Sequence, residues 1–199
     1  MSSRTVGPAA TEAGGRRAEI LERAAVLFAQ RGFLGVSIDD IGAAAGITGP
    51  GIYRHFVGKE ALLGEILISI SERLLEGASA RSSIPGASAE LDALLDFHID
   101  FALSHPELIT VQDRDFYNLS SQDARRVRRL QRQYVELWVD AVRRTVDDID
   151  DAAARAATQA VFGLLNSTPH SANSEALGRN EMAALLHRMA RSALASSCR

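Results

Sequence analysis

The side chains that are best suited to bind a partner lie close together in the sequence, between positions 37 and 59. Six are hydrogen-bond donors and one is a glycine: Ser37, Thr48, Gly51, Tyr53, Arg54, His55 and Lys59. Hydroxyl, imidazole and guanidinium groups reach the phosphates of nucleic acid, and small side chains let a helix approach the DNA major groove closely. This combination predicts a DNA-binding surface. The alternative is an ordinary helical hairpin whose polar face meets only solvent.

Two short helices joined by a tight turn must position these donors. Ser37 followed by Asp40 resembles a capping box and predicts a helix start. Gly46 supplies the left-handed turn that ends this helix, and Thr48 can cap a second one. The apolar residues of both helices then point inward: Ile38, Ile41, Ala45, Ile47, Ile52 and Phe56. The segment therefore predicts a helix-turn-helix.

The chain resembles the TetR/AcrR family of bacterial transcriptional regulators over roughly residues 16 to 65, in the run AVLFAQRGFLGVS followed by IDDIGAAAGITGPGIYRHFVGKEALL. The resemblance implies an all-α fold, with an N-terminal three-helix helix-turn-helix DNA-binding domain and a C-terminal helical ligand-binding and dimerisation domain. It also implies a repressor that a small-molecule effector releases from a palindromic operator in double-stranded DNA. The chain departs from the family pattern at Thr48-Gly49-Pro50-Gly51, where many relatives have Ser-Lys-Gly-Ser or a similar run. Proline is tolerated in a first helical turn, but a basic contact at position 49 is lost.

The helical periodicity divides the chain into three parts. We expect a disordered N-terminal arm over residues 1–15, because this segment is rich in Gly, Ala, Ser and Thr and has no periodicity. The DNA-binding domain is expected over residues 16–62 and the effector-binding and dimerisation domain over 63–199. Helices are predicted at about 16–31, 59–80, 87–104, 107–115, 121–146, 150–167 and 175–195, with a linker at 82–86. We find no strand pattern in the sequence.

Aromatic residues in the C-terminal half suit an apolar pocket with a few polar anchors. The candidate ligand-binding residues are His98, Phe101, Phe116, Tyr117, Tyr134 and Trp138. A plain helical core would contain the same cluster. A single histidine on an apolar stripe is more often a hydrogen-bonded core residue than a ligand contact.

A second resemblance concerns the effector. The chain is similar to family members that regulate lipid and steroid catabolism and respond to acyl-CoA thioesters, through the segment VQDRDFYNLSSQDARRVRRLQRQYVELWVDAV. This resemblance implies an acyl-CoA effector whose phosphates are held by arginines between Arg125 and Arg132. A solvated helix face also explains these arginines.

The last two predicted helices carry many small residues, which allow helices to pack closely. An apolar seam is expected from Leu164, Met182, Leu185, Leu186 and Met189. In the family that the chain resembles, these helices pair with those of a second subunit. We therefore expect a homodimer, as two-fold DNA recognition requires. The alternative is that both helices only close the core of the monomer.

Composition and charge limit which other functions and locations we expect for the protein. A net charge of −3 and a pI near 6.0 argue against non-specific coating of nucleic acid, so DNA binding must be local. Because we find no apolar run of membrane-spanning length and no signal peptide, a cytoplasmic protein without membrane contact is expected. We find no catalytic, metal-binding or cofactor-binding signature. An all-helical adaptor without DNA binding is the main alternative to a regulator, and an enzyme is the weaker one.

Overall fold

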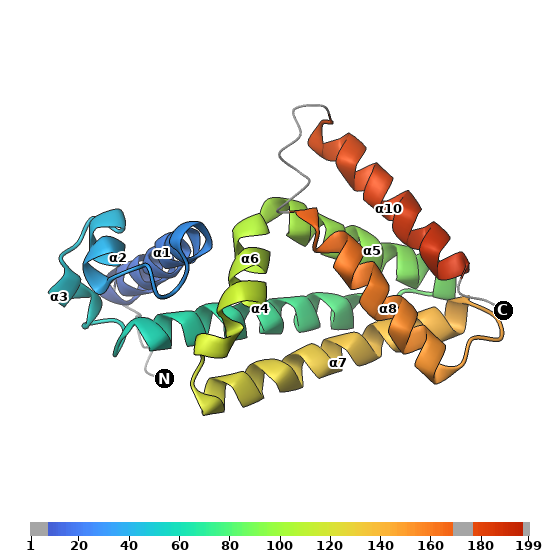
Figure 1. Cartoon of the computed structure of the whole chain (residues 1–199), viewed down its shortest axis with the longest axis horizontal. Helices are drawn as coiled ribbons and strands as arrows, with labels where there is room; N and C mark the ends of the chain where they lie inside the picture. Colours follow the sequence, from blue (N-terminus) through green and yellow to red (C-terminus); the bar gives the residue numbers. More distant parts are fainter. Residues whose placement is uncertain (1–7, 169–176, 197–199) are drawn as a thin grey trace, which may run out of the picture.

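The computed structural model describes residues 8–168 and 177–196, and the regular structure in this part of the chain is entirely helical (Figure 1). The expected all-α class is confirmed. A small group of helices lies at one end: α1 (Pro8–Arg31), α2 (Ile38–Ala44) and α3 (Gly49–Ile52). A long helix, α4 (Lys59–Arg81), leads from this group into a larger bundle (Figure 1).

The larger bundle is built around α4. It contains α5 (Ala87–Ser104), α6 (Pro106–Asp115), the short 3-10 helix η1 (Phe116–Asn118), α7 (Ser121–Thr145), α8 (Asp151–Leu165) and α10 (Arg179–Ala195). α4 and α7 run side by side, and α10 packs against α5 and α8 (Figure 1). Fully buried side chains such as Leu67, Leu91, Leu95 and Trp138 fill the interior. Each buried leucine stabilises such a core by about 1.5–3 kcal/mol.

The prediction of a disordered arm over residues 1–15 is wrong for residues 8–15, because α1 already begins at Pro8. Proline is compatible with a first helical turn, and Ala9 and Ala10 follow it as strong helix formers. Gly14 and Gly15, which lower helix propensity, do not interrupt the helix. The first seven residues of the predicted arm lie outside the described residues.

The predicted border between the two domains, after residue 62, falls inside α4. Leu62 and Leu63 are both fully buried, and Ile66 and Leu67 continue the buried stripe. α4 packs against α1 as well as against α7 and α5. The division into a DNA-binding and an effector domain stays a proposal, and in it α4 is an element that both domains share.

The predicted dimer seam is wrong in part, because some of its residues on α10 are not available to a second subunit. Met182 and Leu186 are buried inside the monomer, where α10 packs against α5 and α8. Met189, by contrast, is 45% exposed. A helical period marks an apolar stripe without telling which partner buries it. A second copy of the chain can therefore use only the outward residues.

Candidate DNA-binding surface and effector cavity

The turn between α2 and α3 forms as the capping residues predict. The Ser37 hydroxyl accepts from the Asp40 backbone N–H at 3.1 Å, and the Asp40 carboxylate accepts from the Ser37 backbone N–H at 2.8 Å. The Thr48 hydroxyl accepts from the Gly51 N–H at 3.3 Å at the start of α3. Gly46 has a φ of +68°, the left-handed conformation that ends α2. The predicted helix-turn-helix is confirmed.

Gly42 allows the two helices to approach closely. A Cβ atom at Gly42 would lie 2.9 Å from the backbone N of Gly49 and 2.9 Å from the carbonyl O of Ile47. Gly49 in turn lies against the carboxylate of Asp39, an exposed side chain that would have to move to admit a Cβ atom at position 49. The absence of a basic residue at position 49 therefore goes together with a tight contact between α2 and α3.

A shallow hollow beside α3 collects most of the predicted DNA-binding residues. Its walls include Arg16, Ile47, Thr48, Pro50, Gly51, Arg54 and His55. Arg54 is exposed and has no carboxylate partner among the described residues. Arg16, from α1, donates to the Ala45 carbonyl O at 3.3 Å and pairs with Glu19 at 2.7 Å. The hollow thus presents guanidinium, hydroxyl and imidazole groups on one face, a set that suits phosphate oxygens.

Two further predicted DNA-binding residues lie outside this hollow. Tyr53 is 59% exposed at the end of α3, so its ring and hydroxyl are accessible. The Ser37 hydroxyl is used within the cap of α2, because it donates to the Asp40 carboxylate at 2.5 Å. This hydrogen bond is the main cause that holds the pKa of Asp40 below its ordinary value. Ser37 therefore shapes the helix-turn-helix, and a phosphate would have to compete with Asp40 for its proton.

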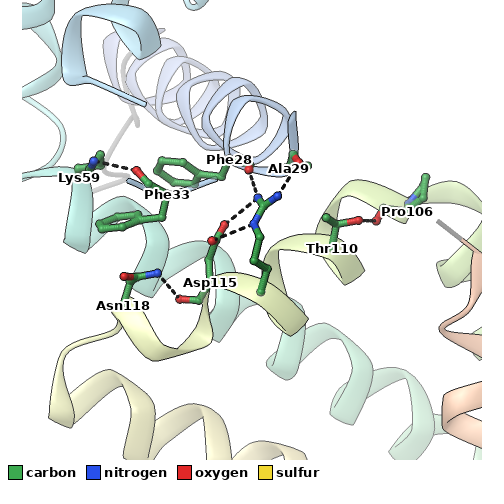
Figure 2. Close-up of polar contacts among 9 residues, drawn as sticks. Phe28, Ala29, Phe33, Lys59, Pro106, Thr110, Asp115 and Asn118 are labelled. Atoms are coloured by element: carbon green, nitrogen blue, oxygen red, sulfur yellow. Dashed lines mark hydrogen bonds and ion pairs between the residues drawn. The ribbon is translucent and has the colours of Figure 1, made fainter. Parts of the chain in front are cut away.

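Lys59, the remaining predicted phosphate contact, is engaged inside the protein. Its ammonium donates to the carbonyl O of Phe33 at 2.8 Å (Figure 2). It also donates to the carbonyl O of Val36 at 2.8 Å and lies 4.3 Å from the centroid of the Phe33 ring. An ammonium has three donors, so two are satisfied by the backbone. Lys59 therefore ties the start of α4 to the turn after α1, and its predicted phosphate contact stays a prediction that relies on the third donor.

A cavity of about 250 Å³ lies within the larger bundle. Its walls come from α4, α5, α6, α7 and α8, together with Asn166, which directly follows the end of α8. The apolar lining residues are Ile70, Leu74, Phe101, Leu108, Ile109, Val135 and Phe162, and the polar ones are Ser71, His98, Gln112, Gln131, Tyr134, Gln159 and Asn166. An apolar cavity with a few converging polar groups is the usual form of a small-molecule site.

His98 is the centre of the polar network in this cavity. It is 4% exposed, and burial lowers its pKa to about 4, so the imidazole is neutral at neutral pH. Its Nδ1 lies 2.7 Å from the Tyr134 hydroxyl and its Nε2 lies 3.0 Å from Oδ1 of Asn166. The ring also stacks on Phe162, with ring centroids 5.1 Å apart. The histidine is thus both a satisfied core residue and part of the cavity wall.

The predicted ligand-binding residues separate into three groups. His98, Phe101 and Tyr134 line the cavity. Trp138 does not line the cavity, which corrects the prediction for this residue: it is fully buried behind the lining, with its ring centroid 5.9 Å from that of His98. Phe116 lies under the guanidinium of Arg128, outside the cavity lining. Tyr117 is 88% exposed.

The structure therefore corrects the prediction for Phe116 and Tyr117 as cavity residues. Both lie in η1, whose three residues follow the end of α6, so an apolar side chain here need not face the interior. Phe162 and Asn166, which were not among the predicted ligand-binding residues, do line the cavity. They lie one helical turn apart, and this i, i+4 spacing of an aromatic and an amide was the available signal.

α6 connects the cavity to the DNA-binding helices. Arg114, near its end, donates to the carbonyl O of Ala29 at 3.1 Å and to that of Phe28, both in the last turn of α1. Its guanidinium also pairs with the Asp115 carboxylate at 3.1 Å. Figure 2 shows Phe28, Ala29 and Asp115 around this contact. A helix C-terminus favours a cation at its free carbonyl groups. Arg114 therefore fastens α6 to α1.

The fold is that of a helix-turn-helix protein with a cavity in its larger helical bundle. Within the described ranges, we find neither a cluster of His, Cys, Asp and Glu that could hold a metal nor a helix fit to span a membrane. Residues 20–66 match the family described as bacterial regulatory proteins, tetR family, and residues 85–195 match the Tetracyclin repressor-like, C-terminal domain. The chain belongs to the TetR family, and it is a regulator rather than an enzyme.

Named relatives and solved structures agree with this assignment. The chain is 31% identical over 136 residues to the HTH-type transcriptional repressor KstR2 of Rhodococcus jostii (strain RHA1), covering 67% of each protein. The structure of the ketosteroid transcriptional regulator KstR2 of Mycobacterium tuberculosis superposes with a TM-score of 0.78 at 20% identity, covering 91% of this chain and 94% of that one. AibR, solved with isovaleryl coenzyme A and operator DNA, has a TM-score of 0.76 at 21% identity, covering 87% and 97%. These two structures share the fold.

Proposed function

We propose that the protein is a transcriptional repressor that binds a palindromic DNA operator through the hollow beside α3. A small apolar molecule in the cavity releases it. The observation that carries the proposal is the hollow, which brings Arg16, Thr48, Arg54 and His55 to one face of the helix-turn-helix. Membership of the TetR family and the identity to a named repressor support it. An all-helical adaptor would leave these exposed donors without a use.

Reading a palindrome requires two copies of the chain, because two recognition helices must enter successive major grooves about 34 Å apart. Outward residues that allow close packing are available on both candidate helices. Ala156, Ala160 and Gly163 are exposed on α8, and Ala184 and Met189 are exposed on α10. We infer a homodimer through these faces, in agreement with the dimers that TetR-family regulators form.

Ligand binding in the cavity can shift the DNA-binding helices through either of two elements, α4 and α6. α4 lines the cavity through Ile70 and begins at Lys59, which is bound to the turn after α1. α6 lines it through Leu108 and Ile109, and its Arg114 holds the end of α1. A ligand that displaces either helix changes the separation of the two α3 helices. Couplings of this kind amount to about 1–3 kcal/mol, and operator DNA must weaken ligand binding by the same factor.

Within the class of small apolar molecules, an acyl-CoA thioester is the more specific candidate for the effector. The AibR structure, which contains isovaleryl coenzyme A, supports it only through a shared fold. Arg128 and Arg132 are exposed on α7 beside Gln131, a cavity residue. The acyl group would enter the cavity and the phosphates would meet these arginines. Replacing both arginines by glutamate should weaken binding of octanoyl-CoA at least about tenfold. Unchanged binding would exclude this placement.

A gel-shift titration on the DNA upstream of the protein's own gene tests the proposed function. We expect a specific complex that survives an excess of unrelated DNA, because specific binding exceeds non-specific binding by roughly a thousandfold or more. A shift that unrelated DNA removes, or no shift at all, would contradict the repressor and favour the adaptor.

A further inference from the structure

The cavity is lined without any charged side chain, within the part of the chain that the structure describes. Its polar groups are two hydroxyls, four side-chain amides and one imidazole. We propose that the molecule, or part of a molecule, that enters the cavity is electrically neutral: an apolar compound that carries hydroxyl or carbonyl oxygen atoms. This inference rests on the proposed function, because it assigns a chemical class to the effector of the same cavity.

The hydrogen bonds of His98 fix which groups remain for a ligand. A neutral imidazole has one donor and one acceptor nitrogen. Since Oδ1 of Asn166 can only accept, Nε2 of His98 donates to it at 3.0 Å. Nδ1 must then accept from the Tyr134 hydroxyl, 2.7 Å away. The Tyr134 oxygen is left as an acceptor and the Asn166 amino group as a donor, so the cavity can bind both kinds of ligand oxygen.

Three glutamine side chains add donors and acceptors of the same neutral kind. Gln112 and Gln131 are half-buried and Gln159 is exposed, on α6, α7 and α8 respectively. None of the three has a hydrogen-bond partner in the described residues. Unpaired amides next to an apolar cavity suit alcohols and ketones, with which they can form hydrogen bonds without burying a charge.

The nearby cations do not supply a partner for an anion inside the cavity. Arg128 and Arg132 are exposed on α7 and are not lining residues, so they can meet only groups that project out of the cavity. The Arg73 guanidinium lies 5.6 Å from the centroid of the Phe101 ring, and Arg73 itself is exposed and is not a lining residue. Arg81 donates to the Gly77 carbonyl O at 2.8 Å and lies over Phe97. A carboxylate in the cavity would therefore lose its hydration without gaining an ion pair, which is strongly unfavourable.

Three probes with the same chain length test the inference: 1-octanol, 2-octanone and octanoate. Trp138 is the only tryptophan of the chain and contacts His98, Tyr134 and Phe162, so its fluorescence reports binding. At neutral pH we expect both neutral probes to bind and octanoate to bind at least about tenfold more weakly. Octanoate binding as tightly as 1-octanol would overturn the inference, and so would a lack of response to both neutral probes at millimolar concentration.

A matched pair of variants on α7 tests the same point from the protein side. Gln131→Arg places a cation at the cavity, whereas Gln133→Arg places one on the exposed face of the same helix. We expect Gln131→Arg to bind octanoate at least about tenfold more tightly than the unmodified protein and Gln133→Arg to leave octanoate binding unchanged. Equal responses of the two variants would contradict the assignment of the cavity.

Tyr134→Phe separates an alcohol from a ketone. The Tyr134 oxygen can accept from the hydroxyl of 1-octanol, while 2-octanone has no donor for it. We expect the variant to bind 1-octanol about fivefold more weakly, the effect of one hydrogen bond, and to bind 2-octanone as before. An equal loss for both probes would count against the assigned hydrogen-bond direction.

Operator binding measured on the same samples keeps this inference apart from the proposed function. Absence of a specific DNA complex in the protein without any probe contradicts the repressor, whatever the probes do. A protein that binds its operator but prefers octanoate contradicts only the neutral ligand class.

Discussion

His98 is a buried group whose neutral state the fold requires. Its pKa falls from 6.5 to about 4 on folding, chiefly because burial disfavours the charged ring. Between these two values the unfolded chain binds a proton that the folded protein does not. The free energy of unfolding therefore falls as the pH is lowered from 6.5 toward 4, and the contribution of His98 is fully present above pH 6.5.

Replacing His98 by glutamine should remove this pH dependence. We expect His98 to lower the free energy of unfolding of the unmodified protein by about 3 kcal/mol at most across this window. The other histidines are the same in both proteins, so the difference between the two curves isolates His98. Urea unfolding at several pH values measures it. Parallel curves for the two proteins would contradict a buried, neutral His98.

Lys59 is expected to stabilise the N-terminal domain through its contacts with Phe33 and Val36. Lys59→Met keeps most of the side-chain stem but leaves two carbonyl groups without their charged partner. We expect the free energy of unfolding to fall by about 2 kcal/mol, measured by urea unfolding. Unchanged stability together with a uniform loss of operator affinity and a shallower salt dependence would instead indicate that Lys59 mainly contacts phosphate.

At the scale of elements, α6 is the most direct link between the cavity and α1. Arg114→Ala removes a cation from the last carbonyl groups of α1, which we expect to destabilise that helix end by about 1–2 kcal/mol. Amide hydrogen exchange over residues 28–32 should become faster. Arg126→Ala is the control, because the Arg126–Glu72 ion pair is exposed and contributes little. Equal exchange rates in both variants would contradict the claim that Arg114 links α6 to the end of α1.

The helices themselves were largely predictable from the sequence, since capping residues and helical periods act over a few residues. Ser37, Gly46 and Thr48 were assigned correctly for this reason. The contact of Arg114 with α1 was not predictable, because it joins residues 85 and 86 positions apart and leaves no local pattern. Tyr117 failed for a related reason: the short η1 has no period that would set the direction of its side chains.

At the scale of the whole molecule, the dimer depends on which side of α10 faces outward. Met189→Glu adds a charge to an exposed face, so the monomer should stay folded while burial of an unpaired carboxylate costs the dimer several kcal/mol, roughly 3–5. Leu186→Glu is the matched comparison. Because Leu186 is 4% exposed, that change should unfold the monomer itself. Sedimentation of Met189→Glu as a dimer at micromolar concentration would contradict the proposed interface.

Only some of the residues that line the cavity could be predicted from the sequence. His98 and Tyr134 were identified because aromatic side chains with a polar atom suit an apolar pocket that has a few polar anchors. Gln112, Gln131 and Gln159 were not, since an amide on a helix surface has no distinguishing pattern until the fold brings α6, α7 and α8 together. Their arrangement is a property of packing, and it sets the chemical class of the proposed ligand.

The most direct measurement is the salt dependence of operator binding by Arg54→Ala and by a control, Arg23→Ala, in fluorescence anisotropy. Arg54 lies in the hollow beside α3, whereas Arg23 is exposed on α1 outside it. If each Arg54 of a dimer neutralises one phosphate, its loss should lower the slope of log K against log salt by about 2 and weaken binding, while Arg23→Ala should match the unmodified protein. Unchanged affinity and slope in Arg54→Ala would contradict the claim that this surface binds the operator.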